Sequence, residues 1–170
     1  MKAKPLSTGR AGFTLIEILI VLALVAILAT LAVPSIQDRL VRQQIVEASK
    51  LADIAKVPIA VAWSLEPHKL PADNAAAGLP PPAKIVSNYV TSVSVEGGAI
   101  HLVFGNHANG VLQGKTLTLR PAVVADAPVV PVAWLCGHAA AVDKMTAMGA
   151  DRTDIAAKYL PLNCLAPAAP

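Results

Sequence analysis

The hydrophobic positions of the chain follow two patterns, which change near residue 34. From Phe13 to Val33 nearly every residue is apolar, and Glu17 is the only charged residue in the run. As a helix this run is about 31 Å long, close to the roughly 30 Å hydrocarbon thickness of a bilayer. The pattern predicts a helix that spans a membrane over residues 13–35.

Beyond Pro34 the apolar residues recur at spacings of three and four, which is typical of an amphipathic helix. We expect this second half of the helix over 36–63, with its apolar side packed on the protein's own sheet. The apolar stripe comprises Val41, Ile45, Ala48, Ala52, Ala55 and Ile59. Pro34 is expected to kink the helix, and Pro58 to kink it again or end it early, because proline lacks an N–H and crowds the preceding turn.

Alternating segments later in the chain predict an antiparallel sheet over 89–135, after a proline-rich loop over 64–88. Gly97 and Gly98 are expected to join the first two strands as a hairpin, and Pro131 to place the fourth strand at an edge or a bulge. The strands are expected over 89–95, 99–104, 112–119 and 129–135.

The last segment, 136–164, is expected to be a loop with one helical piece over 139–148. Cys136 and Cys164 are the only cysteines, and a lone pair in an exported chain is expected to form one disulfide. A thiol at Cys136 beside His138 as a base is the alternative, but adjacent residues of an extended segment point apart. The predicted fold is therefore α+β: a long N-terminal helix, membrane-spanning in its first half, on a roughly four-stranded antiparallel sheet with a disulfide-closed C-terminal loop.

The net charge of +3 could suggest a nucleic-acid partner. Its distribution argues against that, because Lys2, Lys4 and Arg10 all precede the apolar run and the rest of the chain carries 11 basic and 11 acidic residues. A basic leader over 1–12 before an apolar segment is a topology signal that keeps the leader on the cytoplasmic side.

Glu17 separates the interpretations of the apolar run. A cleavable secretory signal, cut near 29–32, would have a shorter apolar region without a carboxylate. In an ordinary membrane anchor, burying the carboxylate of Glu17 in the bilayer would cost free energy, because no partner would neutralise it. Cleavage between Gly12 and Phe13 would supply one, since the new amine of Phe13 is cationic near neutral pH and could neutralise Glu17 of a neighbouring subunit, fixing the axial register.

The basic leader, the sequence Gly12-Phe13-Thr14-Leu15-Ile16-Glu17 and the apolar run ending at Pro34 resemble the class III signal of type IV pilins and pseudopilins. The resemblance implies cleavage after Gly12 by a prepilin peptidase and methylation of the new N-terminus at Phe13. It also implies a role in subunit register and assembly for Glu17 and a helix kink at Pro34. Filament contacts are then expected mainly on 13–36.

The C-terminal half resembles type IVa major pilins in the segments 114–119, 134–137 and 158–161, the last leading into Cys164. In that group the two cysteines bond to close a surface loop, the D-region, which major pseudopilins of type II secretion usually lack. The resemblance implies a structural subunit and not an enzyme, in the inner membrane as a single-pass precursor and in an extracellular pilus after assembly.

The implied partners are the chain itself as a helical homopolymer, the prepilin peptidase, an assembly ATPase with its inner-membrane platform, and an outer-membrane secretin. Filaments of this kind serve adhesion, twitching motility or DNA uptake. Two alternatives remain: a minor pilin or pseudopilin that binds DNA or a surface or acts in type II secretion, and a membrane-tethered enzyme, for which no motif is present. No cofactor or metal is expected, and the histidines are expected on surfaces or loops: His68, His101, His107 and His138.

Overall fold

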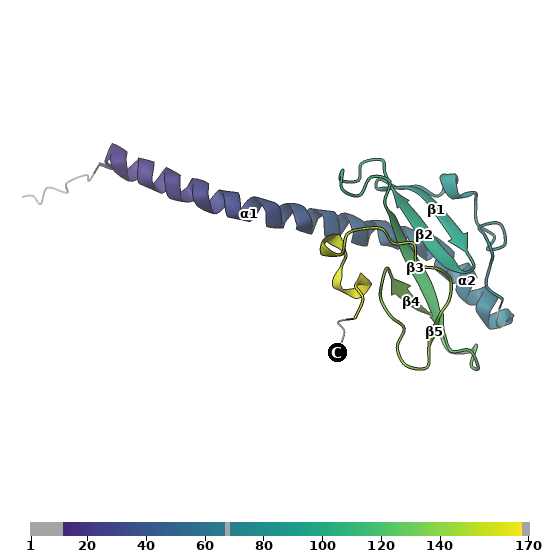
Figure 1. Cartoon of the computed structure of the whole chain (residues 1–170). Helices are drawn as coiled ribbons and strands as arrows, with labels where there is room; N and C mark the ends of the chain where they lie inside the picture. Colours follow the sequence, from purple (N-terminus) through teal and green to yellow (C-terminus); the bar gives the residue numbers. More distant parts are fainter. Residues whose placement is uncertain (1–11, 67–68, 168–170) are drawn as a thin grey trace, which may run out of the picture. The chain divides into compact units, whose positions relative to one another are not determined.

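The computed structural model describes residues 12–66 and 69–167 and divides between Gln37 and Asp38 into two compact units (Figure 1). The first unit contains the N-terminal part of the long helix, and the second contains the rest of that helix and the sheet. Residues 1–11 of the expected leader and His68 lie outside the described residues.

The long helix is interrupted by one tighter turn. α1 (Leu15–Ser49) is followed by a 3-10 turn (Lys50–Ala52) and then by α2 (Asp53–Leu65). An early end at Pro58 is wrong, because α2 continues through this proline to Leu65. α1 includes Pro34, and the kink expected there stays a prediction. Over 12–66 and 69–167 no helix is both long and apolar enough to cross a membrane, in contrast to the span expected over 13–35.

The predicted antiparallel sheet is confirmed and has one additional short strand. The strands run in the order β1-β2-β3-β4, every pair is antiparallel, and β5 pairs with the end of β3. The strands are β1 (Val90–Glu96), β2 (Ala99–Phe104), β3 (Thr116–Val123), β4 (Ala133–Cys136) and β5 (Thr146–Ala147). Short 3-10 turns lie at Pro82–Lys84, Ala157–Tyr159 and Leu162–Cys164.

The β1–β2 hairpin forms where the two glycines predict it. Gly97 and Gly98 have φ angles of 54° and 83°, and a two-residue turn with positive φ at both positions matches the twist of the strands that it joins. The turn pairs Glu96 with Ala99, which fixes the register of the whole hairpin.

Two strands begin four residues later than the sequence predicts, and one expected helical piece does not form. The expected strand over 112–119 begins only at Thr116, because the backbone N–H of Leu112 bonds to the carbonyl of Asn109 (2.8 Å) in a turn. The fourth strand begins at Ala133, after Pro131, which has no N–H for a sheet. The helical piece expected over 139–148 is wrong: Lys144 has a φ of 68°, which no right-handed helix contains, and β5 follows it.

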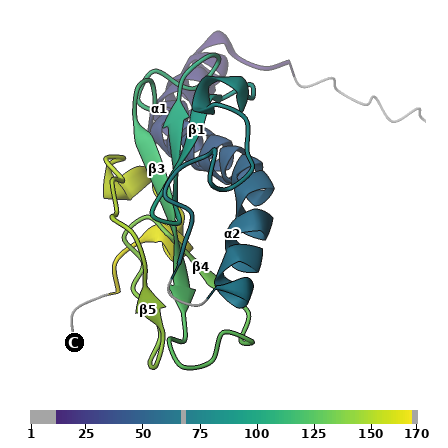
Figure 2. The ribbon, with the colours of Figure 1, turned by 90° about the vertical axis from the view of Figure 1, so that its right-hand side faces the viewer.

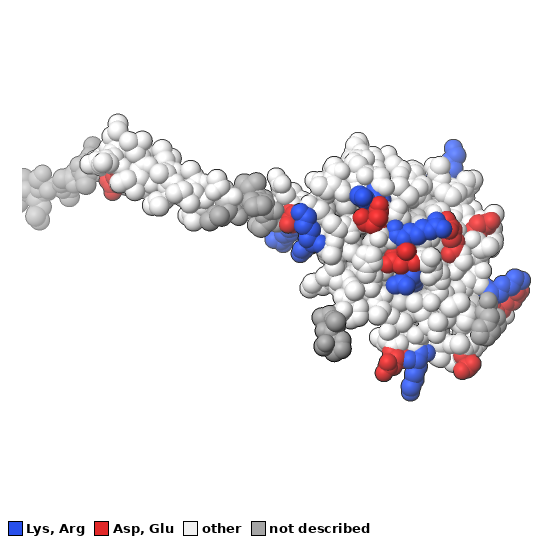
Figure 3. Space-filling view, in the orientation of Figure 1, with Lys and Arg blue, Asp and Glu red and all other residues white. Residues whose placement is uncertain are grey.

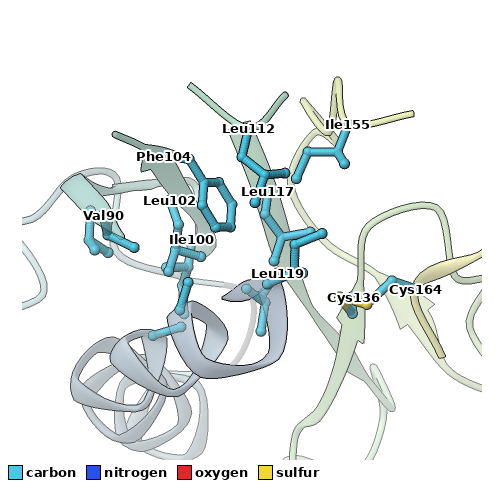
Figure 4. Packing of buried hydrophobic residues seen from close by; sticks show 14 of the residues in the cluster. Val90, Ile100, Leu102, Phe104, Leu112, Leu117, Leu119, Cys136, Ile155 and Cys164 are labelled. Atoms are coloured by element: carbon cyan, nitrogen blue, oxygen red, sulfur yellow. A yellow bond between two sulfur atoms is a disulfide. The ribbon is translucent and has the colours of Figure 1, made fainter. Parts of the chain in front are cut away.

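The core lies between the amphipathic helix and the sheet, as the apolar stripe predicts. Every residue of that stripe is at most 2% exposed. Ile100 and Leu102 of β2 and Leu117 and Leu119 of β3 meet the helix from the sheet (Figure 4). The side chains in the middle of the stripe are small and buried, at Ala48, Ala52 and Ala55. Because they are small, the helix can lie close to the sheet there. Figure 2 shows α2 on one side of the strands and the chain around β5 on the other.

Candidate functional site

The first turns of α1 expose apolar side chains in every direction. Between Phe13 and Leu28 the large apolar residues are 45% to 79% exposed. Figure 3 shows one acidic side chain near the start of the segment and no other charged side chain on the visible face of its described residues. An apolar surface of this extent marks an interaction site. These side chains are Phe13, Leu15, Ile16, Ile18, Leu19, Ile20, Val21, Leu22, Leu24, Val25, Ile27 and Leu28.

Glu17 lies in the first turn of the helix, next to its capping residue. The backbone N–H of Glu17 donates to the hydroxyl oxygen of Thr14 (3.3 Å) and to its carbonyl (3.1 Å). Thr14 and Glu17 thus have the spacing of a capping box, in which a threonine caps the helix and a glutamate stands three residues later. These two bonds use the backbone N–H of Glu17 and not its carboxylate. The sequence Thr14-x-x-Glu17 directly before an apolar run is a signature from which this helix start could be predicted.

Gly12, the predicted cleavage position, is exposed, and a Cβ added to it would meet no atom within 4 Å. The fold of this chain therefore does not itself require glycine there.

The predicted disulfide between Cys136 and Cys164 is confirmed. Both residues are buried, at 8% and 2% exposure, and belong to the core cluster (Figure 4). The described cysteines are thus all bonded, which excludes a free thiol at Cys136 beside His138. The loop is also tied to the helix, because the guanidinium of Arg42 donates to the carbonyl of Lys158 from Nε (3.1 Å) and Nη2 (2.6 Å).

A strap of four residues, Asp151–Asp154, fastens the middle of the loop to the sheet. β4 pairs with β3 only from Leu119 onward, which leaves the first half of that edge of β3 without a strand partner. The backbone N–H groups of Thr116 and Thr118 donate instead to Asp154 Oδ1 (2.6 Å) and Thr153 Oγ1 (3.1 Å). The strap therefore covers an edge that would otherwise be open to pairing with another chain.

Charged side chains hold the first two residues of the strap. Arg152 forms an ion pair with Glu96 of β1, and Nδ1 of His138 lies 2.7 Å from Oδ2 of Asp151. Burial favours a higher pKa for the Asp151 carboxyl, but hydrogen bonds from the hydroxyl and N–H of Thr153, together with His138, keep its pKa below the usual value. Figure 3 shows many of the charged side chains on this face as adjacent basic and acidic pairs.

His101 is buried, contrary to the surface or loop position expected for it. It is 3% exposed on β2, and its Nδ1 lies 3.0 Å from the hydroxyl of Thr118, which also accepts the backbone N–H of Arg152 (3.0 Å). Burial lowers the pKa of His101, and the charge of Arg152 lowers it further, while Glu96 and Asp151 oppose that shift. Within 12–66 and 69–167 no three metal-ligating side chains come together.

An exposed apolar helix, together with a helix-on-sheet unit and a disulfide-closed loop, is typical of one class of protein, the subunits of larger assemblies. The sequence profile of the family described as pilin (bacterial filament) matches residues 41–165. The profile of the prokaryotic N-terminal methylation motif matches residues 7–33, which include Gly12, Phe13 and Glu17.

The chain is similar to named pilins and fimbrial proteins, two of which match over nearly its whole length. The type IV major pilin protein PilE1 of Neisseria gonorrhoeae is 37% identical over 165 residues, which are 94% of this chain and 89% of that protein. A fimbrial protein of Neisseria meningitidis serogroup B is 34% identical over 94% of this chain and 96% of its own. The fimbrial protein EcpC of Eikenella corrodens is 42% identical over 64% of this chain and 72% of its own.

The chain belongs to the type IV pilin family and is a structural subunit of a bacterial pilus. Family membership implies self-assembly into a surface filament, and the methylation motif implies processing at the N-terminus of a membrane-anchored precursor.

Proposed function

We propose that this chain is the major subunit of a type IV pilus, cut between Gly12 and Phe13 by a prepilin peptidase and methylated at Phe13. The observation that carries the proposal is the exposed apolar helix with one carboxylate, Glu17, inside the match to the methylation motif. The matching relatives that are named major pilins support the major rather than a minor role. The role is structural and involves no catalysis by this chain.

Before assembly the segment 13–35 holds the precursor in the inner membrane with a single pass, and after assembly the chain lies in the extracellular pilus. An assembly ATPase with its platform and an outer-membrane secretin carry the subunit between these places. The filament then serves adhesion, twitching motility or DNA uptake.

In the filament, the cationic amine of Phe13 neutralises Glu17 of a neighbouring subunit. A carboxylate surrounded by apolar helices is costly without a partner, and one buried polar pair among apolar contacts selects a single axial register. A kink at Pro34 adapts the helix between its two halves.

The test compares two substitutions of Glu17 in the native host, because the capping box offers a competing explanation for this residue. Glu17→Ala removes the charge and the capping partner, whereas Glu17→Gln removes the charge and keeps a side chain suited to the capping box. Both variants are expected to be processed and yet to yield few or no sheared filaments. Ser49→Ala, which removes a hydroxyl that donates to the carbonyl of Val46 (2.8 Å) in the same helix and lies outside the segment 13–36, is the control and should assemble normally.

Normal filament yield with Glu17→Gln would overturn the charge pairing and leave capping as the role of Glu17. The N-terminal mass of the mature chain tests the processing itself. A methylated terminus at Phe13 supports the proposal, and a terminus within 29–33 would mean an ordinary secreted protein. Copy number in sheared filaments separates the major subunit from a minor pilin.

A further inference from the structure

The loop between β2 and β3 contains the pair Asn109-Gly110, and both residues are exposed. The side-chain amide of an asparagine can be attacked by the main-chain nitrogen of the next residue, which modifies the chain covalently. A side chain on that next residue hinders the attack, and glycine has none. Among the five asparagines of the chain only Asn109 precedes a glycine, since the others precede alanine, tyrosine, histidine and cysteine.

The fold does not require glycine at position 110. A Cβ added to Gly110 would meet no atom within 4 Å, and Gly110 is not among the glycines with positive φ. Gly114 of the same loop differs, because its φ of 72° is one that other residues rarely adopt. The missing side chain of Gly110 therefore has a chemical consequence, access to the neighbouring amide, rather than a conformational one.

The hydrogen bonds of Asn109 favour attack on its side chain. The N–H of Val111 donates to Oδ1 of Asn109 (3.1 Å), an Asx turn that folds the side chain toward the residues that follow it. The same N–H would stabilise the negative charge that develops on Oδ1 when Cγ is attacked. Among the described residues, neither the side-chain NH2 of Asn109 nor the N–H of Gly110 finds an acceptor, so the leaving group and the nucleophile are both free.

The other asparagines of the fold are held or hindered. The side-chain NH2 of Asn106 donates to two main-chain carbonyls, and so does that of Asn74, which is 5% exposed. Asn88 is exposed, and its side chain has no hydrogen-bond partner in the described part of the chain, but Tyr89 follows it. Asn88 is therefore the reference that matches Asn109 in exposure and freedom and differs in the next residue.

We propose that Asn109 is a site of spontaneous deamidation in the folded chain, with water as the only co-reactant. The main-chain nitrogen of Gly110 attacks Cγ of Asn109 and gives up its proton, and the amide nitrogen accepts a proton and leaves as ammonia. The product is a five-membered succinimide. Water then opens the ring: breaking the bond from the nitrogen to Cγ gives aspartate, and breaking the bond from the nitrogen to the main-chain carbonyl carbon gives isoaspartate.

The reaction changes both charge and main-chain path at this loop. Either product is a carboxylate at neutral pH, and because the chain beyond residue 12 has equal numbers of basic and acidic side chains, its formal charge changes from zero to −1. The N–H of Asn109 donates to Oε1 of Gln44 on α1 (2.8 Å), and its carbonyl accepts the N–H of Leu112 (2.8 Å). Isoaspartate adds a methylene to the main chain beside these two bonds, which loosens the attachment of the loop to the helix. The proposal is independent of the filament function, since it needs only the folded chain.

The test incubates the purified full chain in detergent at pH 8 and 37 °C for several weeks, beside a sample unfolded in urea. Trypsin releases residues 85–115 as one peptide that contains Asn88, Asn106 and Asn109, so digestion treats the three alike and a sample from time zero gives the background. Mass spectrometry with fragmentation locates each replacement of NH2 by OH. Isoaspartyl methyltransferase with a labelled methyl donor measures isoaspartate.

Conversion of Asn109 in the folded chain is expected to be at least tenfold faster than that of Asn88 or Asn106, with more isoaspartate than aspartate. Gly110→Ala should slow it at least tenfold and leave the urea midpoint unchanged, because the added Cβ meets nothing within 4 Å. Equal rates at Asn109 and Asn88, an absence of isoaspartate, or conversion of Asn109 only in the unfolded sample would overturn the proposal. The comparison with Asn88 uses the unaltered chain, so it holds even if the variant misfolds.

Discussion

Removal of the disulfide is expected to destabilise the pilin and to release its C-terminal loop unevenly. The perturbation is the double substitution Cys136→Ala and Cys164→Ala, which avoids burying new hydroxyls at two positions that are 8% and 2% exposed. The bond joins residues separated by 28 positions. In the chain-entropy model a closed loop of about 29 residues stabilises the folded state by roughly 3.6 kcal/mol.

The strap determines which parts of the C-terminal loop are released when the disulfide is removed. Without the disulfide, Asp151–Asp154 still bond to β3 and β1, so the middle of the loop stays attached while its two ends are released. Trypsin can cleave after Lys144, Arg152 and Lys158. Cleavage is expected to accelerate most at Lys144, in its exposed turn, and least at Arg152, which is held by Glu96.

The assay is urea unfolding of the full chain in detergent, followed by timed trypsin digestion with mass spectrometry. The free energy of unfolding should fall by about 3 kcal/mol, within the roughly 2–5 kcal/mol typical of native disulfides. A loss below about 1 kcal/mol would refute the entropic argument. Equal acceleration at all three sites would refute the anchoring role of the strap.

Gly12→Ala is expected to leave folding unchanged, since an added Cβ meets nothing within 4 Å, but to slow leader removal, measured as the ratio of precursor to mature chain. Gly149→Ala should lower the free energy of unfolding by about 1–3 kcal/mol in urea, because φ is +78° and the new Cβ would lie 2.6 Å from that of Ala99. Burial and the charge of Arg152 lower the pKa of His101 from 6.5. Just below pH 6.5 the unfolded chain therefore binds a proton that the folded chain does not. The free energy of unfolding should decrease as the pH is lowered through this range. Urea midpoints at pH 7.5 and 5.5 check this, and His101→Gln should lose the dependence.

Several features of this protein follow from sequence alone because they depend on near neighbours in the chain. The spacing of Val41, Ile45 and their stripe identifies the buried side of the helix, since a helix places residues three and four apart on one face. Gly97-Gly98 specifies the hairpin, since few other residues adopt positive φ in succession. With two cysteines only one intramolecular pairing exists, so the disulfide could be predicted without the fold.

Contacts between distant segments decided the remaining features. The free edge of β3 exists because β4 begins only at Ala133, and this edge recruits the strap from more than 30 residues later in the chain. His101 alternates with core residues and would face solvent on a bare sheet, but the strap bonds to Thr118, the hydrogen-bond partner of His101, and His101 is buried. The segment 139–148 has a helix-like composition, yet pairing of β5 with β3 extends it. A local sequence pattern does not identify such partners. Hydrogen bonds and burial by residues distant in the chain override the intrinsic secondary-structure preference of a segment.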